Sequence, residues 1–288
     1  MPCGDIPATL WVVSAALYPL PNVTAATAAL LALAAGVALP VYLLFYRPVG
    51  DERTWGLAEI GAISILFMLT LPVAFVLAGV AEPLTLTSFS AATLAQNGLF
   101  VGLSAYVVAI RYRQDLARLG LRAADWPRAA ALGAGAAVLT VPAAMGAEHV
   151  AVFLLGLVEG PAQAAARAAA EHLTDPLLPV LSTLGGPLEA AWFLALVVVV
   201  VPVGEEVFFR GLVYGALRAR WGAVAAAVAS ALFFTAVHLQ VVHALPIFVL
   251  GVILAGLYER TGTLVPAIVA HAANNVVAVV ALWRGWGW

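Results

Sequence analysis

Two adjacent glutamates, Glu205 and Glu206, lie within a long apolar stretch that continues through Phe208 and Phe209 to Arg210. A carboxylate at the centre of a lipid bilayer costs roughly 2.5–3.5 kcal/mol on insertion scales. A chain that carries two of them side by side must neutralise them or use them. The pair therefore predicts polar partners elsewhere in the chain that lie at a similar depth.

The composition places this stretch in a membrane. Of the 288 residues, 64% are hydrophobic and 10% are charged, against about 25% charged residues in a soluble domain. The net charge of −2 gives no reason to expect a nucleic-acid partner. Cys3 is the single cysteine, so we expect no internal disulfide. The first residues lack the positive region of a cleaved signal peptide.

Hydrophobic segments predict an all-α polytopic membrane protein. A spanning helix needs about 20 apolar residues. Eight segments are candidates for such helices and are expected to form one bundle: 23–46, 57–80, 88–110, 129–157, 188–217, 222–241, 243–258 and 264–283. Short interfacial helices are predicted at 8–20 and 162–172, and a partly amphipathic element at 111–128.

Arginine placement predicts the orientation of the bundle, because cytoplasmic loops carry an excess of basic residues. Arginines follow every odd-numbered predicted span: Arg47, Arg53, Arg111, Arg113, Arg118, Arg122, Arg128, Arg218, Arg220 and Arg260. The loops on the other side are mostly acidic or neutral, with Arg284 as an exception. We therefore expect a multi-pass protein of the cell membrane whose odd-numbered spans exit to the cytoplasm and whose two termini lie outside.

The same segments suggest a division of the chain. Residues 1–128 are predicted to hold the first three spans and a basic cytoplasmic linker. Residues 129–288 are predicted to hold the last five spans, with the functional core within 188–280.

Spacing sorts the polar residues of this core onto helix faces. Glu206 and Arg210 are four residues apart, so they can pair along one face, and Glu205 points about 100° away. Phe234 and His238 share the same spacing, as do His271 and Asn275. Asn274 adds a second amide next to Asn275.

Distances from the predicted turns place these residues at comparable depths. Glu205 lies 16 residues before Trp221 and His238 lies 17 residues after it, which corresponds to ~24–26 Å on antiparallel helices. His271 and Asn275 lie ~14–20 Å beyond the turn near Gly262. With helix tilt, one shared pocket is feasible.

Such a set predicts hydrolysis with water as the nucleophile. A desolvated Glu205 together with His238 could deprotonate a water that attacks an amide carbonyl. His271 and Asn275 could donate hydrogen bonds to the oxyanion. No serine or cysteine is placed as a nucleophile beside these histidines, so covalent catalysis is not expected.

Three motifs carry a resemblance to a known family. They are Glu205-Glu206-x-x-x-Arg210, Phe234-x-x-x-His238 and His271-x-x-x-Asn275, in this order and on separate segments. The set resembles the CPBP family (CAAX proteases and bacteriocin-processing proteins, or Abi family), which includes the type II CAAX prenyl endopeptidases. The stretch from Leu119 to Arg122 also looks like bacterial members.

The resemblance implies an eight-helix intramembrane glutamate protease without a required cofactor. It gives water activation to Glu205 with His238 and the oxyanion hole to His271 with Asn275. Arg210 would order Glu206, with Phe234 and Asn274 as supporting residues. The expected partners are the lipid bilayer and a peptide or membrane-anchored protein substrate.

Two other functions remain open at this point. Glu205, His238 and His271 are legitimate zinc ligands, with Glu206 as a further carboxylate, although no His-Glu-x-x-His signature is present. Intramembrane carboxylates also serve transporters and membrane scaffolds, and inverted-repeat symmetry would favour that function.

A few polar residues stand apart from the motifs. Glu148 and His149 interrupt an apolar run and are interpreted as a helix end or break near the outer surface. His243 is interpreted as a boundary residue, with a substrate-facing role as the alternative. Glu59 and Gln96 lie inside predicted spans and could line a cavity or satisfy one another.

Overall fold

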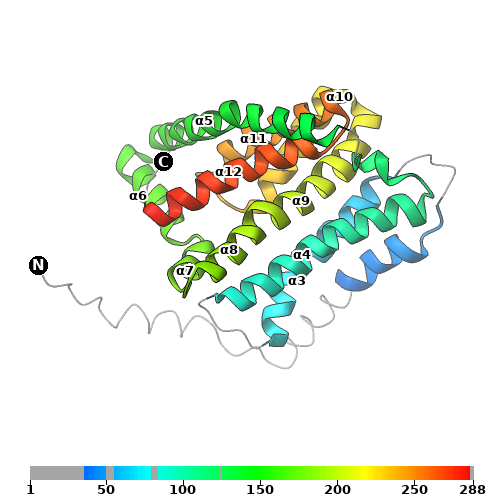
Figure 1. Ribbon diagram of the computed structural model, residues 1–288, viewed down its shortest axis with the longest axis horizontal. Coiled ribbons are helices and arrows are strands. Elements are labelled where there is room, and N and C mark those ends of the chain that lie inside the picture. The colour runs from blue at the N-terminus through cyan, green and yellow to red at the C-terminus, as the bar shows by residue number, and fades with distance from the viewer. Residues whose placement is uncertain (1–35, 50–54, 79–83, 123–124, 286–288) are drawn as a thin grey trace, which may run out of the picture.

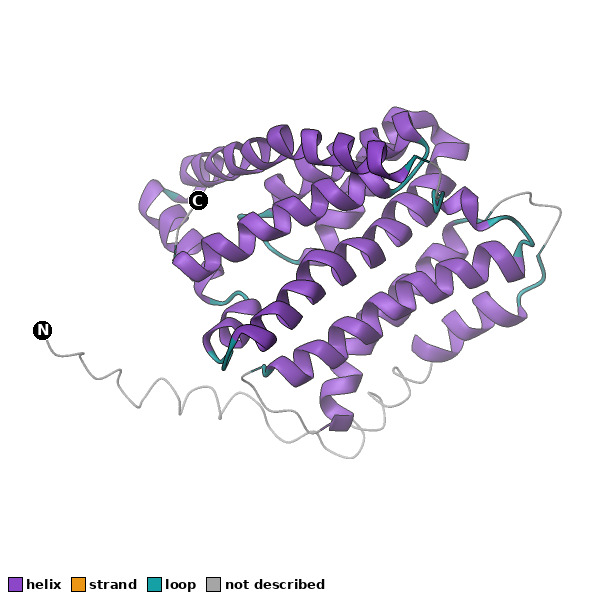
Figure 2. Ribbon diagram, viewed as in Figure 1, coloured by secondary structure: helices purple, strands orange, loops and turns teal. Residues whose placement is uncertain are grey.

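The computed structural model describes residues 36–49, 55–78, 84–122 and 125–285. Within these ranges the chain is helical and contains no strand (Figure 2). The α-helices are α3 (Leu57–Ala78), α4 (Leu86–Ala105), α5 (Trp126–Glu159), α6 (Pro161–Leu173), α7 (Leu177–Ser182), α8 (Pro187–Ala195), α9 (Val201–Glu206), α10 (Gly215–His238), α11 (Ala244–Thr261) and α12 (Val265–Arg284). Shorter helical turns are η1 (Tyr42–Tyr46), η2 (Tyr106–Arg111), η3 (Leu116–Leu119), η4 (Leu196–Val200) and η5 (Val207–Tyr214).

Five helices in the described ranges are long and apolar enough to cross a membrane: Leu86–Arg111, Trp126–Glu159, Pro187–His238, Ala244–Thr261 and Val265–Arg284. The protein is therefore a multi-pass membrane protein. The third of these runs for 52 residues and turns at Gly222, whose φ of 77° and ψ of 173° are not helical. This turn separates the predicted spans 188–217 and 222–241. Glycine can occupy it because a residue without a Cβ tolerates positive φ without a steric penalty.

The eight-span count stays a prediction. Shorter apolar helices occupy Gly36–Tyr46 and Leu57–Leu69, within the first two predicted spans. Most of the first span, together with the predicted interfacial helix at 8–20, lies outside the described residues.

The helices form one layered bundle (Figure 1). Helix α5 packs along α11 and α12, and α10 packs against α11. On the other side of α12 lies the continuous run from α8 through η5, which packs against α4, and α4 packs against α3. Helices α6 and α7 lie at one end of the bundle, near the C-terminal end of α12.

The two short elements expected at the interface differ in outcome. Residues 162–172 form a helix as predicted, as part of α6. Between η2 and α5, the described residues 112–122 form the short turn η3, which Asp115 caps by accepting a hydrogen bond from Ala117 N at 2.7 Å. Leu119 of this turn is buried in the core.

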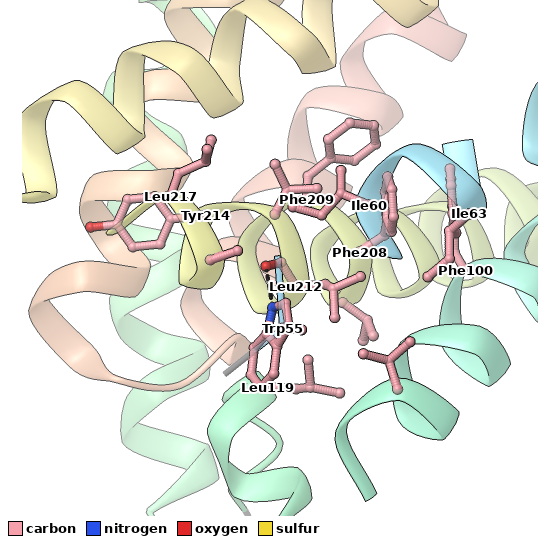
Figure 3. Close-up of a cluster of buried hydrophobic side chains, with 14 of the residues drawn as sticks. Trp55, Ile60, Ile63, Phe100, Leu119, Phe208, Phe209, Leu212, Tyr214 and Leu217 are labelled. Atoms are coloured by element: carbon pink, nitrogen blue, oxygen red, sulfur yellow. Dashed lines mark hydrogen bonds between the residues drawn. The ribbon is translucent and has the colours of Figure 1, made fainter. Parts of the chain in front are cut away.

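The main core lies between α3, α4 and η5 (Figure 3). Phe100 stacks on Phe208 with ring centroids 4.4 Å apart, and Phe208 meets Phe209 edge-on at 5.0 Å. Such aromatic pairs contribute about 0.5–1.5 kcal/mol beyond their area burial. They fix η5, and with it the adjacent glutamates, against the first helices.

The segment that follows the glutamates is π-helical, and π-helical turns often occur at functional sites. Side chains from other helices bond two of its carbonyls. Trp55 Nε1 donates to Leu212 O at 2.8 Å (Figure 3), and Ser230 Oγ donates to Phe209 O at 3.1 Å. Unsatisfied backbone groups are costly in a membrane, so these bonds stabilise the irregular segment.

We predict that Gly251→Ala destabilises the bundle by about 1–3 kcal/mol, the usual cost of overpacking. A Cβ at Gly251 of α11 would lie 2.9 Å from Ala231 Cβ of α10. Gly256→Ala on the same helix is the matched control, because a Cβ there meets nothing within 4 Å. Thermal unfolding in detergent compares the two variants, and equal midpoints would contradict the prediction.

Candidate active site

Arg210 and Glu206 form a fully buried ion pair on one helix face, as their spacing predicts. Arg210 Nη1 donates to Glu206 Oε1 at 2.7 Å, and the two side chains are 1% and 0% exposed. Arg210 Nη2 also donates to Gly251 O at 3.2 Å, and the guanidinium lies 4.5 Å from the Phe234 ring centroid. The arginine therefore ties η5 to α10 and α11.

His271 lies between the two glutamates. Its Nδ1 is 2.8 Å from Glu206 Oε1, and its Nε2 is 3.6 Å from Glu205 Oε2. The spacing of the sequence leaves Glu205 without a local partner, and the partner comes from α12, 66 residues away in the chain. Glu205 Oε2 is buried and accepts no hydrogen bond within the described part of the chain.

The contacts of His271 constrain where protons lie. Glu206 accepts from Arg210 and is best described as a carboxylate, so Nδ1 of His271 carries a proton and donates to it. Arg210, Glu206 and an ionised Glu205 together carry one net negative charge. One further proton, on Nε2 of His271 or on Glu205, makes the buried set neutral, which reduces the cost of burying it. The two candidate atoms, His271 Nε2 and Glu205 Oε2, lie 3.6 Å apart.

His238 is held by a different contact. Its Nδ1 is 2.7 Å from Phe234 O, and its ring meets the Phe234 ring edge-on with centroids 4.6 Å apart. A carbonyl can only accept, so Nδ1 carries the proton and Nε2 of the neutral ring is left as an acceptor. In the described residues no hydrogen bond or ion pair joins His238 to Glu205.

The two asparagines tie α12 to its neighbours. Asn275 Nδ2 donates to Val197 O at 2.9 Å, and Asn274 Nδ2 donates to Thr140 Oγ1 at 2.8 Å. An asparagine amide has two N–H donors, so Asn275 keeps a second one for a ligand. Asn274 uses its other N–H on Ala270 O at 2.9 Å, which suits a structural role.

A cavity of about 230 Å³ joins most of these side chains. Its wall includes His238, His271, Asn274, Asn275 and Phe234, so two of the three motifs contribute to it. Glu205 is not among the lining residues and reaches the cavity through its contact with His271. The rest of the wall is largely apolar, which suits a polypeptide segment with hydrophobic side chains.

A second polar cluster lies at one end of this cavity. Glu171 of α6 accepts hydrogen bonds from the backbone N–H groups of Val241, Val242 and His243 at 3.1–3.2 Å, and it contacts His243 Nδ1 at 2.8 Å. Nε2 of His243 lies 3.8 Å from Glu148 Oε2. Glu171 therefore anchors the loop that directly follows His238. Residue spacing in the sequence could not predict this contact, because the partners of Glu171 lie about 70 residues away.

Two expectations outside the motifs need correction. Glu148 and His149 do not mark a helix end, because α5 continues unbroken to Glu159 and Glu148 faces the cavity. Glu59 is not satisfied by Gln96. It bonds Gly56 N at 3.0 Å, and Arg111 and the Tyr112 hydroxyl at 3.3 and 3.1 Å, because it lies in the first turn of its helix.

The arrangement also bears on the zinc hypothesis. Zinc in proteins is usually held by three or four side chains that converge on one point. In the described part of the chain, no group of three or more His, Cys, Asp or Glu side chains converges in this way. Glu206 is already committed to Arg210 and His271. The residues as arranged do not fit a zinc centre.

Comparison with known proteins supports the resemblance carried by the motifs. Residues 187–277 match the family described as type II CAAX prenyl endopeptidase Rce1-like. The matched segment contains Glu205, Glu206, Arg210, Phe234, His238, His271 and Asn275. No curated protein and no solved structure matches the chain. Over the matched segment, the chain is thus similar to a family of endopeptidases.

We predict that Arg210→Met destabilises the protein by about 3–5 kcal/mol, because it leaves the Glu206 carboxylate buried without its counter-charge. The double variant with Glu206→Gln should recover part of this loss. Arg218→Met is the control, since its pair with Glu259 is largely exposed and should contribute about 1 kcal/mol or less. Unfolding in detergent measures all three, and an equal loss for both arginines would refute the argument.

The loop anchored by Glu171 gives a second prediction. Burial favours a raised pKa, but hydrogen bonds from Val242 and His243 outweigh it and hold the pKa of Glu171 below its ordinary value. The carboxylate therefore stabilises the loop at neutral pH, and this contribution is lost as the pH falls through that lowered pKa. Other titratable groups at this end are Glu148, His172, Asp175 and His243.

We expect Glu171→Ala to speed amide exchange at Val241, Val242 and His243 near neutral pH, because three N–H groups lose their acceptor. Hydrogen exchange followed by mass spectrometry measures it. Arg167→Ala is the matched control on the same helix, because it removes the hydrogen bonds to Glu159 and leaves the three loop N–H groups their acceptor. Unchanged exchange in Glu171→Ala would show that the carboxylate does not hold the loop.

Proposed function

We propose that this protein is an intramembrane endopeptidase that hydrolyses a peptide bond at or near the membrane with a water nucleophile. The single observation that carries the proposal is the buried set of Arg210, Glu206, His271 and Glu205, which adjoins a cavity lined by His238 and Asn275. The similarity of residues 187–277 to type II CAAX prenyl endopeptidases supports a peptidase.

In the proposed reaction, water lies between the Glu205 carboxylate and Nε2 of His238. The carboxylate takes a proton as the water oxygen bonds to the carbonyl carbon. The oxyanion accepts hydrogen bonds from Nε2–H of His271 and the second N–H of Asn275. The proton returns to the leaving nitrogen as the carbon–nitrogen bond breaks.

The other residues position this machinery. Glu206 keeps Nδ1 of His271 protonated and stabilises the positive ring that an oxyanion donor at Nε2 requires. Arg210 holds Glu206 in place, and Phe234 packs edge-on against both histidine rings. The eight-span bundle, with its basic loops in the cytoplasm, is the topology that we propose for the whole chain.

We predict that Glu205→Gln lowers peptidase activity by about 10²–10⁴-fold, the range that general acid–base catalysis contributes. Asn275→Ala should lower the turnover number by about 10²–10³-fold, as expected when one oxyanion donor is removed. Both effects are measured on detergent-purified protein with a pool of quenched fluorogenic peptides. Glu259→Gln is the control, because this glutamate pairs with Arg218 outside the candidate site. Wild-type cleavage by Glu205→Gln would refute the proposed base.

The zinc alternative makes a different prediction. A metal-dependent enzyme would lose activity to a chelator, regain it on addition of Zn²⁺ and carry stoichiometric metal when purified without chelator. The proposed mechanism expects full activity in the chelator.

A further inference from the structure

The ends of the helices that carry arginines lie together at one end of the bundle. Arg218, near the start of α10, pairs with Glu259 at the end of α11 at 2.9 Å. Arg220 donates to Trp55 O, just before α3, at 3.2 Å. These contacts join segments that are far apart in the sequence.

Further contacts extend the same end to the remaining basic segments. Arg111, at the end of η2, donates to Arg47 O at 2.8 Å. The stretch after η3 bonds the turn between α11 and α12, where Leu264 N donates to Gly120 O at 3.1 Å. The loops that the sequence assigns to one side by their arginines therefore do meet in space.

The cavity is lined by the halves of these helices that lie away from the arginines. On α10, Arg218 and Arg220 lie near the start, whereas the lining residues Phe234 and His238 lie at the end. On α11 the order reverses, because lining residues begin at Pro246 and Arg260 lies in the last turn. The cavity is therefore remote from the basic end.

The same holds for the other two long helices that line it. On α5, Arg128 lies in the first turn and the lining runs from Val141 to Glu148. On α12, which begins beside the basic end, the lining runs from His271 to Leu282. The α10–α11 loop and the turn before α7 complete the wall at the far end.

That far end is acidic. It carries Glu148, Glu159, Glu171, Asp175 and Glu189 against Arg167 and Arg284. Basic residues accumulate on the cytoplasmic side of membrane proteins, so the far end lies outside the cytoplasm. In Figure 1, α6 and α7 mark this end.

We infer that the candidate active site opens to the non-cytoplasmic side of the membrane, and that its substrate is an extracytoplasmic polypeptide segment without a prenyl group. The substrate part of this inference rests on the proposed peptidase function. An exported peptide or the outer flank of a membrane protein has the required chemistry. A prenylated C-terminus in the cytoplasm would meet the arginine-rich end instead.

Cysteine labelling tests the orientation without using catalysis. In a Cys3→Ser background, single cysteines replace Val241 and Leu173 at the cavity end, and Leu121 at the basic end. All three side chains are exposed, at 53%, 69% and 43%. A membrane-impermeant maleimide added to intact cells should label Val241→Cys and Leu173→Cys, and should label Leu121→Cys only after permeabilisation. The reverse pattern would overturn the inference.

Oriented membrane vesicles test the substrate class. Right-side-out and inside-out vesicles receive the same fluorogenic peptide pool, with and without a farnesyl group. We expect Glu205-dependent cleavage of the unmodified pool in right-side-out vesicles and its loss in inside-out vesicles. Cleavage of farnesylated peptides alone, or only in inside-out vesicles, would overturn the substrate class. External labelling without cleavage in either orientation would uphold the orientation and reject the peptidase function.

Discussion

The buried carboxylate of Glu206 is the interaction on which the rest of the site depends. It binds a guanidinium from its own helix and an imidazole from α12, and the guanidinium in turn binds a carbonyl of α11. One ionised side chain thus fixes three helices relative to one another. Removing one charged partner would leave the other buried without compensation, which is costly. The hydrogen bond to Glu206 therefore fixes the position of the His271 ring.

This constraint separates the roles of the two adjacent glutamates. Glu206 is committed to two positively charged or donating partners, whereas Glu205 faces one nitrogen of His271 at 3.6 Å. Neutrality of the whole set requires one further proton, on His271 or on Glu205. A hydrolase that uses water needs such a group, because it must accept a proton and later return it.

The composition and the apolar segments of the sequence were sufficient to predict a membrane protein and the segments that form its long helices. Long apolar segments predicted the spanning helices from residue 57 onward, and the turn at Gly222 falls at the boundary between two predicted spans. The pairing of Glu206 with Arg210 and the packing of Phe234 against His238 followed from their spacing of four residues. Local geometry on a helix depends only on the rise and turn of the backbone, so such pairs can be read from sequence.

Contacts between helices could not be read in this way. The sequence paired Glu205 with His238, and the tertiary structure adds His271, whose Nε2 lies 3.6 Å from Glu205 Oε2. The tertiary structure also shows that Glu171 anchors the loop after His238 and that Glu148 lines the cavity. The sequence by itself determined the membrane class, the helical segments, the polar motifs and the basic loops. Only the tertiary structure decided which polar side chains meet, because helix tilt and rotation are set by packing between helices rather than by residue spacing.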